Sequence, residues 1–173
     1  MANSIQISFT ESINVTTTRS FIEALCREID SNPLATEVVV HMSTPGGDVE
    51  LAIEIYNFLR NLDCRVITVN TSFVNSAGIL IFLAGNERVC LPASSFYVHS
   101  VTKNLNGTFT FKDLEREVRE IKENTRKILY LIENNTLKSS AYWRSMMQKG
   151  AILPAKKAID LGLAHILKDT TLS

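Results

Sequence analysis

Ser76 is the residue whose neighbours best suit nucleophilic chemistry. It follows a strand-like segment at residues 64–69, lies in a turn of small residues at 75–78, and precedes an apolar run at 79–84. A serine on a sharp turn at a helix start has an exposed oxygen, and unpaired backbone N–H groups nearby can bind an oxyanion. The same stretch also fits a serine that caps the helix, because serine is a preferred N-cap residue.

Acyl transfer also needs a base and donors for the oxyanion, and two further stretches offer them. His99 ends a strand-like run at 95–99, and Gly46 and Gly47 follow the β-branched run at 38–42. The carboxyl ends of parallel strands meet at one edge of a sheet, where α/β proteins build their sites. We therefore expect Ser76, His99 and the two glycines to converge, although fifteen serines and three histidines allow many pairs by chance.

The elements that must position these residues alternate between strand and helix patterns. Strands are predicted at 5–9, 38–42, 65–69, 88–91, 95–99 and 164–167, and helices at about 14–32, 48–62, 77–84, 112–134, 139–149 and 154–161. Alternation in the first half predicts parallel strands with right-handed crossovers, and hence an α/β fold. His41 is interpreted as a core or strand-end histidine.

The long predicted helix at 112–134 carries a narrow apolar stripe on a charged surface. Its members are Leu114, Val118, Ile121, Thr125, Ile128 and Ile132, which are spaced alternately by four and three residues. A helix of this kind more often projects and packs on a partner than lies fully buried.

Composition narrows the classes of partner. Lys plus Arg number 18 and Asp plus Glu number 18, so the net charge is zero. A zero net charge argues against nucleic acid or an anionic membrane as the main partner. The longest apolar run, 77–84, is too short to span a bilayer, and the start lacks signal-peptide features. Cys26, Cys64 and Cys90 are expected to be buried reduced thiols, with no metal-ligand spacing. We expect a cytoplasmic protein without metal or cofactor.

Four motifs, in order along the chain, resemble the proteolytic subunit of Clp protease (ClpP). Residues 43–47, Ser-Thr-Pro-Gly-Gly, resemble its N-S-P-G-G turn, and residues 75–78 resemble its A-S-M-G nucleophile turn. Residues 95–99 resemble the strand that ends in its catalytic histidine. Residues 153–164 are similar to its closing motif, which signal-peptide peptidases and the crotonase superfamily share. The resemblance runs from about Ile5 to Leu167.

The resemblance implies one ClpP/crotonase-like α/β domain over residues 1–173, built from repeated β-α-β units. The head would comprise about 1–99 and 137–173. A protruding hairpin and long helix at about 100–136 would form the handle that joins two heptameric rings into a chamber. The implied activity is serine endopeptidase cleavage of peptides or unfolded proteins.

The resemblance also implies roles for individual residues. Ser76 would be the nucleophile and His99 the general base, and the backbone N–H groups of Gly47 and Ala77 would form the oxyanion hole. The residues that would hold the backbone of an extended peptide are Gly46, Asp48, Val49, Lys103, Asn104 and Leu105.

The sequence departs from the family pattern in three places. The family's catalytic aspartate falls on Gly150, so Ser76 and His99 would form a slow dyad unless Gln148, Asn135 or a backbone carbonyl replaces it. Asn75 stands where the family has a small apolar residue. Most of the N-terminal segment that meets the ATPase partner is missing, which leaves docking to an AAA+ unfoldase in doubt.

Three other interpretations remain open at this stage. The chain is an inactive ring or scaffold subunit, or a partner of an active paralogue, if His99 finds no orienting group. A crotonase-type acyl-CoA enzyme needs an oxyanion hole but no Ser/His pair. Lys149 is interpreted as a solvated charge at a helix end, against the alternative of a serine-lysine dyad.

Overall fold

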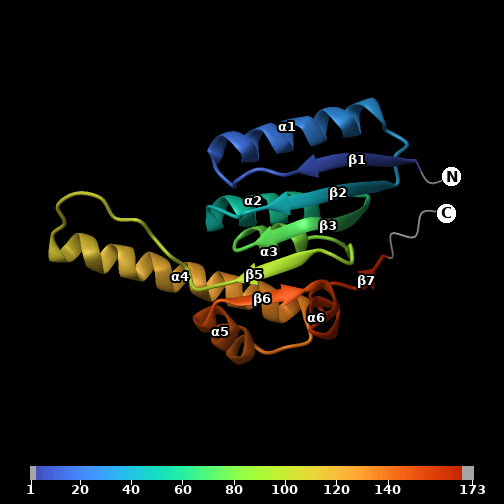
Figure 1. The fold of residues 1–173 in the computed structure, drawn as a ribbon. Coiled ribbons are helices and arrows are strands. Elements are labelled where there is room, and N and C mark those ends of the chain that lie inside the picture. Colours follow the sequence, from blue (N-terminus) through green and yellow to red (C-terminus); the bar gives the residue numbers. More distant parts are fainter. Residues whose placement is uncertain (1–2, 169–173) are drawn as a thin grey trace.

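The computed structural model describes residues 3–168, which alternate between strands and helices (Figure 1). In chain order the elements are β1 (Ser4–Phe9), α1 (Val15–Ser31), β2 (Glu37–Thr44), α2 (Val49–Arg60), β3 (Arg65–Asn75), α3 (Gly78–Phe82), β4 (Glu87–Cys90), β5 (Ser95–Val98), α4 (Phe111–Asn135), α5 (Ser140–Lys149), β6 (Ala151–Pro154), α6 (Ala155–Asp160) and β7 (Ile166–Leu167). The predicted α/β class is confirmed.

The strands form one sheet whose main path is β1-β2-β3-β4-β7, with every neighbouring pair parallel. Strand β3 changes partner along its length. Residues 67–70 pair with β4, and residues 73–75 pair with β5. This split carries β3 directly into the Ser76 turn and sets the end of β5 beside it.

One strand was not predicted. Strand β6 pairs antiparallel with β5, with Tyr97 opposite Ile152 and Ser95 opposite Pro154. Its four residues end in a proline, which the sequence pattern assigned to the start of a helix. A proline at the end of an edge strand is tolerated, because its missing N–H is not needed there.

Helix α3 is short and apolar all round, as a fully buried helix should be. All five of its residues are buried, and Phe82 packs edge-on against Phe96 of β5 with ring centroids 5.0 Å apart. The core thus holds the helix that follows Ser76 rigidly against the sheet.

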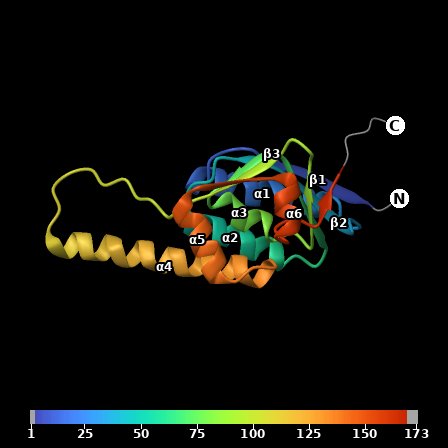
Figure 2. The same ribbon diagram turned by 60° about the horizontal axis from the view of Figure 1, so that its bottom comes forward.

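Helix α4 begins at a capping box, in which Thr110 and Asp113 cap each other's backbone N–H groups. Its N-terminal part projects well beyond the head (Figures 1 and 2). The apolar stripe accordingly divides, since Leu114 and Val118 are exposed while Ile132 is buried in the head. The boundaries proposed for head and handle stay a prediction.

The segment at 99–110 runs alongside α4 without forming a strand (Figure 2). The predicted hairpin is therefore not seen among these residues, because their backbone groups pair with no neighbouring strand of this chain. An extended segment of this kind leaves its N–H and C=O groups available to another chain.

Arg88 of β4 fastens the base of α4 to the sheet. Its guanidinium donates to the carbonyl oxygens of Asn135, Gly162 and Leu163 at 2.8–2.9 Å. Burial lowers the pKa of Arg88 to about 10. Three carbonyls at the ends of α4 and α6 thus depend on one buried side chain.

The expectation of three buried thiols is wrong for two of them. Cys90 is buried, and burial raises its pKa to about 11. Cys64 is half-buried and Cys26 is exposed, because Cys26 lies on the outer face of α1, next to the buried Leu25. His41 is half-buried in β2, and its Nε2 lies 2.8 Å from Oε1 of Gln6.

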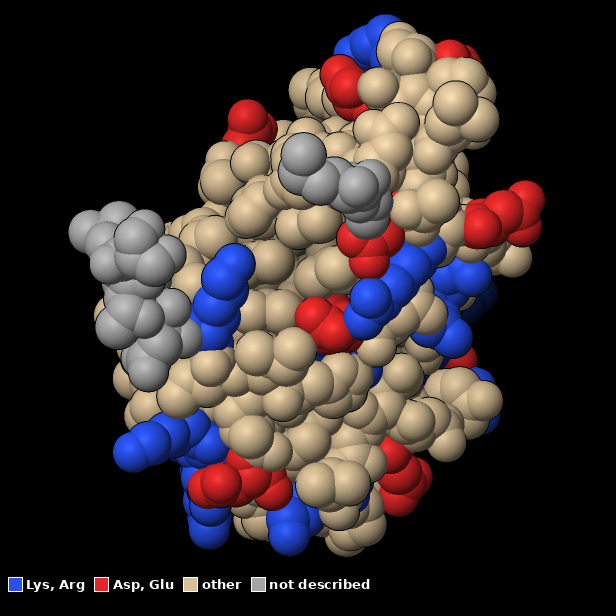
Figure 3. Space-filling view, turned by 90° about the vertical axis from the view of Figure 1, so that its right-hand side faces the viewer, with Lys and Arg blue, Asp and Glu red and all other residues tan. Residues whose placement is uncertain are grey.

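Charges of both signs lie side by side on the end of the head opposite the tip of α4 (Figure 3). Arg65, for example, pairs with both Glu37 and Glu87. Within residues 3–168, no helix is both long and apolar enough to cross a membrane.

Candidate active site

One pocket brings together the four residues expected to do chemistry. Ser76, Ala77, His99 and Gly47 line it, and they come from the β3–α3 turn, the end of β5 and the β2–α2 turn. The rest of the lining is almost wholly apolar and consists of Val49, Ile79, Val98, Val101, Thr102, Ile128, Ile132 and Met147. The structure thus brings these residues together at the carboxyl ends of neighbouring strands, as predicted.

The Ser76 turn has an unusual backbone. Its φ angle is +54°, and no other residue apart from glycine has a positive φ within 3–168. Its N–H donates to the carbonyl oxygen of Tyr97 at 2.8 Å, which pins the turn to β5. Holding a serine in this left-handed region costs on the order of 1–3 kcal/mol, and such strain is typical of functional turns.

The alternative that Ser76 caps the following helix is wrong. Helix α3 begins at Gly78, its N-cap is Ala77, and no side chain caps it. The Ser76 hydroxyl is therefore not engaged in capping, and it remains available to the pocket that the residue lines.

Gly46 lies directly against the Ser76 turn. A Cβ on Gly46 would lie 2.6 Å from the carbonyl oxygen of Asn75 and 2.7 Å from Cβ of Ser76. Its φ angle of +92° also disfavours other residues. Glycine is needed here because two turns approach each other too closely for a side chain.

The backbone of Gly47 faces the pocket. The two neighbouring residues both bond to Ile13, since Ile13 N–H donates to Gly46 O at 2.9 Å and Asp48 N–H donates to Ile13 O at 3.0 Å. Successive residues of an extended chain point their backbone groups to opposite sides. The N–H of Gly47 is therefore directed away from Ile13, on the side of the pocket that it lines.

Ala77 supplies a second free donor. It stands at the N-terminal end of α3, where the first N–H groups have no intrahelical acceptor. Backbone N–H groups from Gly47 and Ala77 in one pocket with Ser76 are the arrangement that stabilises a tetrahedral oxyanion.

The residues expected to bind a peptide backbone are not all free to do so. Gly46 already donates to Thr44 Oγ1 and accepts from Ile13. The backbone N–H of Asp48 donates to Ile13 O at 3.0 Å, and its carbonyl oxygen accepts from Ala52 N–H at 3.1 Å. Val49 is the member of this group that lines the pocket.

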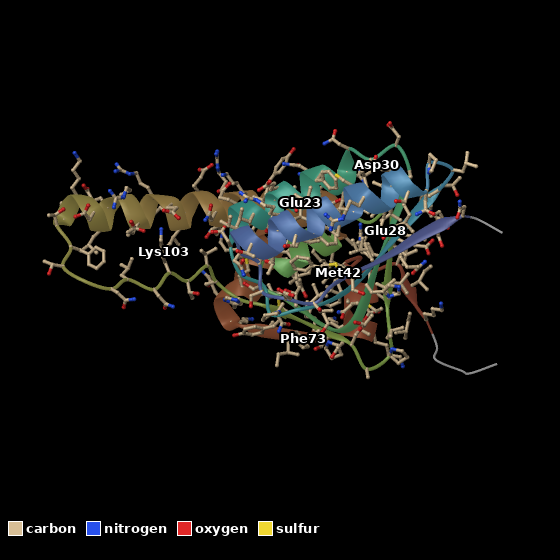
Figure 4. The ribbon with its side chains drawn as sticks, turned by 90° about the horizontal axis from the view of Figure 1, so that it is seen from above. Glu23, Glu28, Asp30, Met42, Phe73 and Lys103 are labelled. Carbon is tan, nitrogen blue, oxygen red and sulfur yellow. The ribbon has the colours of Figure 1, made fainter. Side chains whose placement is uncertain are left out.

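Lys103 is occupied by ion pairs with α4. Its ammonium lies 2.5 Å from Glu117 and 2.6 Å from Glu120, so the side chain reaches from the extended segment to the helix (Figure 4). These hydrogen bonds, that of Glu117 first, raise the pKa of Lys103, and Lys103 in turn lowers the pKa of Glu117. Asn104 and Leu105 are exposed beyond the pocket.

His99 is held in one tautomer by its neighbour. Its Nδ1 lies 2.7 Å from the carbonyl oxygen of Ser100. A carbonyl oxygen can only accept, so Nδ1 carries the proton and Nε2 has a free lone pair. Within 3–168 no hydrogen bond joins the Ser76 hydroxyl to this ring, and in unliganded enzymes that bond often tightens only with substrate.

Gly150 is the position on which the resemblance places the family's catalytic aspartate. Gly150 ends α5 with φ +67°, and a Cβ there would lie 3.2 Å from the Tyr97 hydroxyl oxygen. The Tyr97 ring is stacked on His99, with centroids 5.0 Å apart and planes at 23°. An aromatic side chain therefore fills the space beside the histidine.

Of the groups considered as substitutes for the aspartate, a backbone carbonyl is the one in contact with His99. Asn135 bonds instead to Leu131 O and Tyr56, and Gln148 and Lys149 are exposed. Side chains alternate along a strand, so the spacing of Tyr97 and His99 by two residues predicts that they share a face.

No group of three or more His, Cys, Asp or Glu side chains suited to a metal ion occurs in the described part of the chain. The arrangement of serine, histidine and backbone donors can act on an acyl group without a metal ion.

Comparisons with known proteins agree with this geometry. The family model described as Clp protease matches residues 1–170. The ATP-dependent Clp protease proteolytic subunit 2 of Treponema pallidum is 26% identical over 150 residues, covering 84% of this chain and 74% of that protein. The subunit 2 of Gluconobacter oxydans is 31% identical over 137 residues, covering 73% of this chain and 57% of that protein.

A solved structure shares the fold. A mutant ClpP1 from Listeria monocytogenes superposes with a TM-score of 0.82 at 21% identity, covering 98% of this chain and 93% of that one. The fold of this chain is thus a known architecture.

Proposed function

The chain belongs to the Clp protease family, and from that premise we propose that it is a serine-type endopeptidase subunit in which Ser76 is the nucleophile and His99 the general base. The observation that carries the proposal is the shared pocket. It combines the strained Ser76 turn, a histidine with a free Nε2, and the backbone donors of Gly47 and Ala77.

The proposed reaction follows the order of acyl transfer. Nε2 of His99 takes the proton of the Ser76 hydroxyl as its oxygen attacks the peptide carbonyl, and the N–H groups of Gly47 and Ala77 stabilise the oxyanion. The imidazolium then gives its proton to the leaving amine. Water, activated by the same Nε2, releases the acyl group from Ser76.

Reduced turnover is part of the proposal. The Ser100 carbonyl selects the productive tautomer of His99, but it lacks the charge by which a carboxylate stabilises the imidazolium. In a well-studied triad, exchanging the aspartate for a neutral residue lowers kcat by about 10⁴-fold, largely through the wrong tautomer. We expect a smaller loss here because the tautomer is right.

The lining of the pocket supports a substrate class. Its surface beyond the catalytic groups is formed by aliphatic and methionine side chains from α2, α3, α4 and α5. We propose that it accepts an apolar side chain next to the cleaved bond. An extended peptide would add as a strand beside Gly47 and Val49, with the unpaired backbone of 103–105 on its other side.

The proposal extends to assembly and location. Exposed Phe111, Leu114 and Val118 near the tip of α4 support docking of the handle on a second ring, and the family supports heptameric rings that enclose the sites. We propose a cytoplasmic enzyme acting on peptides or unfolded proteins, and leave open whether an AAA+ unfoldase serves it.

One observation favours a second candidate. Gly150 offers no carboxylate, and a Cβ there would lie 3.2 Å from the hydroxyl oxygen of Tyr97, whose ring stacks on His99. An inactive ring subunit, or a partner of an active paralogue, would retain this fold and lose its turnover.

The test is hydrolysis of fluorogenic peptides with apolar side chains before the cleaved bond. We expect slow turnover that Ser76→Ala and His99→Ala abolish, whereas Ser72→Ala, which changes an exposed serine of β3, leaves it unchanged. Wild-type turnover in His99→Ala contradicts the mechanism. A well-folded oligomer without any turnover favours the inactive subunit.

A further inference from the structure

His99 is held on two sides by neighbours. The Tyr97 ring stacks on one face of the imidazole, with centroids 5.0 Å apart, and the Ser100 carbonyl accepts from Nδ1 at 2.7 Å. We propose that Tyr97 and Ser100 are the positioning residues of His99, and that together they orient the ring in place of a third catalytic side chain. This inference rests on the proposed function, in which His99 is the general base, and it concerns how that base is oriented.

Tyr97 is itself fixed by the sheet. Its carbonyl oxygen accepts from Ser76 N–H at 2.8 Å, and its neighbours across the strands are Asn75 of β3 and Ile152 of β6. Paired on both sides, the backbone of Tyr97 cannot move without moving the Ser76 turn. One residue therefore couples the nucleophile to the base.

The Tyr97 hydroxyl crowds position 150. A Cβ on Gly150 would lie 3.2 Å from that oxygen and 3.8 Å from the ring. A larger group there would have to displace the phenol that lies on His99. The tyrosine and the glycine thus form a matched pair, in which the aromatic ring takes the space beside the imidazole.

Ser100 is bonded to the C-terminal end of α5, where Gly150 also lies. Its hydroxyl donates to the Met147 carbonyl at 3.3 Å, and the N–H of Gly150 donates to that carbonyl at 3.2 Å. The carbonyl that selects the tautomer of His99 is therefore tied to the C-terminus of α5. The stacked ring fixes the plane of the imidazole, and the Ser100 carbonyl fixes its rotation within that plane.

The first test separates stacking from the hydroxyl. Tyr97→Phe keeps the stacked ring, so we expect wild-type kcat, whereas Tyr97→Leu loses it and should lower kcat by about tenfold with little change in KM. Phe73→Leu is the matched control, because Phe73 lies on the adjacent β3 and is 37% exposed, as Tyr97 is. Equal kcat in Tyr97→Leu and the control would overturn the proposal.

The second test does not depend on turnover. Selective ¹⁵N labelling of the three histidines, with His99→Gln for assignment, reports the tautomer and the ring-current shift of His99 by NMR. We expect the Nδ1–H tautomer in the wild type and loss of the ring-current shift in Tyr97→Leu. An Nε2–H tautomer, or an unchanged shift, overturns the proposal. Absent peptidase activity with the expected spectra would instead refute the proposed function alone.

The third test uses the matched pair. Gly150→Asp alone should not raise kcat, because the phenol occupies the space its side chain needs. Combined with Tyr97→Leu, the same aspartate should raise kcat above that of Tyr97→Leu alone. A faster enzyme from Gly150→Asp alone would show that Tyr97 does not fill that space.

Discussion

Replacing Gly46 by alanine should disable Ser76 without touching it. The new Cβ would lie 2.6 Å from Asn75 O and 2.7 Å from Ser76 Cβ, so the two turns must separate by about 0.8 Å to reach an ordinary van der Waals contact. The left-handed φ of +92° adds backbone strain of about 1–3 kcal/mol. Overpacking adds about 1–3 kcal/mol, and displacing a catalytic group by about 1 Å costs roughly 100-fold in rate.

We therefore expect Gly46→Ala to lower the free energy of unfolding by about 2–6 kcal/mol and the rate of fluorophosphonate labelling by roughly ten- to a hundredfold. Gly107→Ala is the matched control, because Gly107 has φ +111° but no heavy atom within 4 Å of an added Cβ. It should label at the wild-type rate. Wild-type labelling and stability in Gly46→Ala would refute the argument that this contact sets the Ser76 turn.

Two further predictions concern stability. The pKa of Glu117 is lower in the folded protein than its ordinary value of 4.5, because of its pair with Lys103. The pair therefore stabilises the fold fully at pH values above 4.5, and this stability is lost as pH falls through the lower pKa of the folded state. The protection factors of the amides at 99–110, corrected for the slower intrinsic exchange in acid, should therefore fall as pH drops, and a persisting acid step in Lys103→Met would contradict this. Arg88→Met should lower the free energy of unfolding in urea by about 3 kcal/mol, since three carbonyls lose their donor, while the exposed Arg65→Met should cost at most about 1 kcal/mol. Equal losses would refute the role of Arg88.

Much of the fold could be predicted because its signals are local. The β-branched run before Gly46 and the alternation of strands and helices predict parallel strands, whose carboxyl ends meet at one edge. Ser76, His99 and Gly47 follow from that rule, and Ala77 was named through the family resemblance. The structure brings all four to one pocket. Their catalytic roles remain a proposal.

What the sequence did not predict depends on contacts between distant segments. Strand β6 exists because Ile152 pairs with Tyr97, which lies 55 residues earlier, and that pairing has no local signature. The same pairing brings Gly150 beside Tyr97, so the closeness of these two residues could not be inferred from either position alone. Whether Ser76 capped a helix likewise depended on its φ of +54°, which the β5 contact sets.

The hairpin expected before α4 shows a different limit. The turn chemistry near Gly107 is present, with φ +111°, but the extended residues find no strand partner within residues 3–168. Strand pairing requires an edge with free N–H and C=O groups, and here such an edge would have to come from a substrate or a second copy.

The central claim is that Ser76 is an activated nucleophile, and fluorophosphonate labelling read by intact mass tests it most directly. We predict one adduct on the wild-type chain, none on Ser76→Ala, and the wild-type adduct on Ser72→Ala. No adduct on the folded wild-type protein, or an adduct that persists in Ser76→Ala, would contradict the claim.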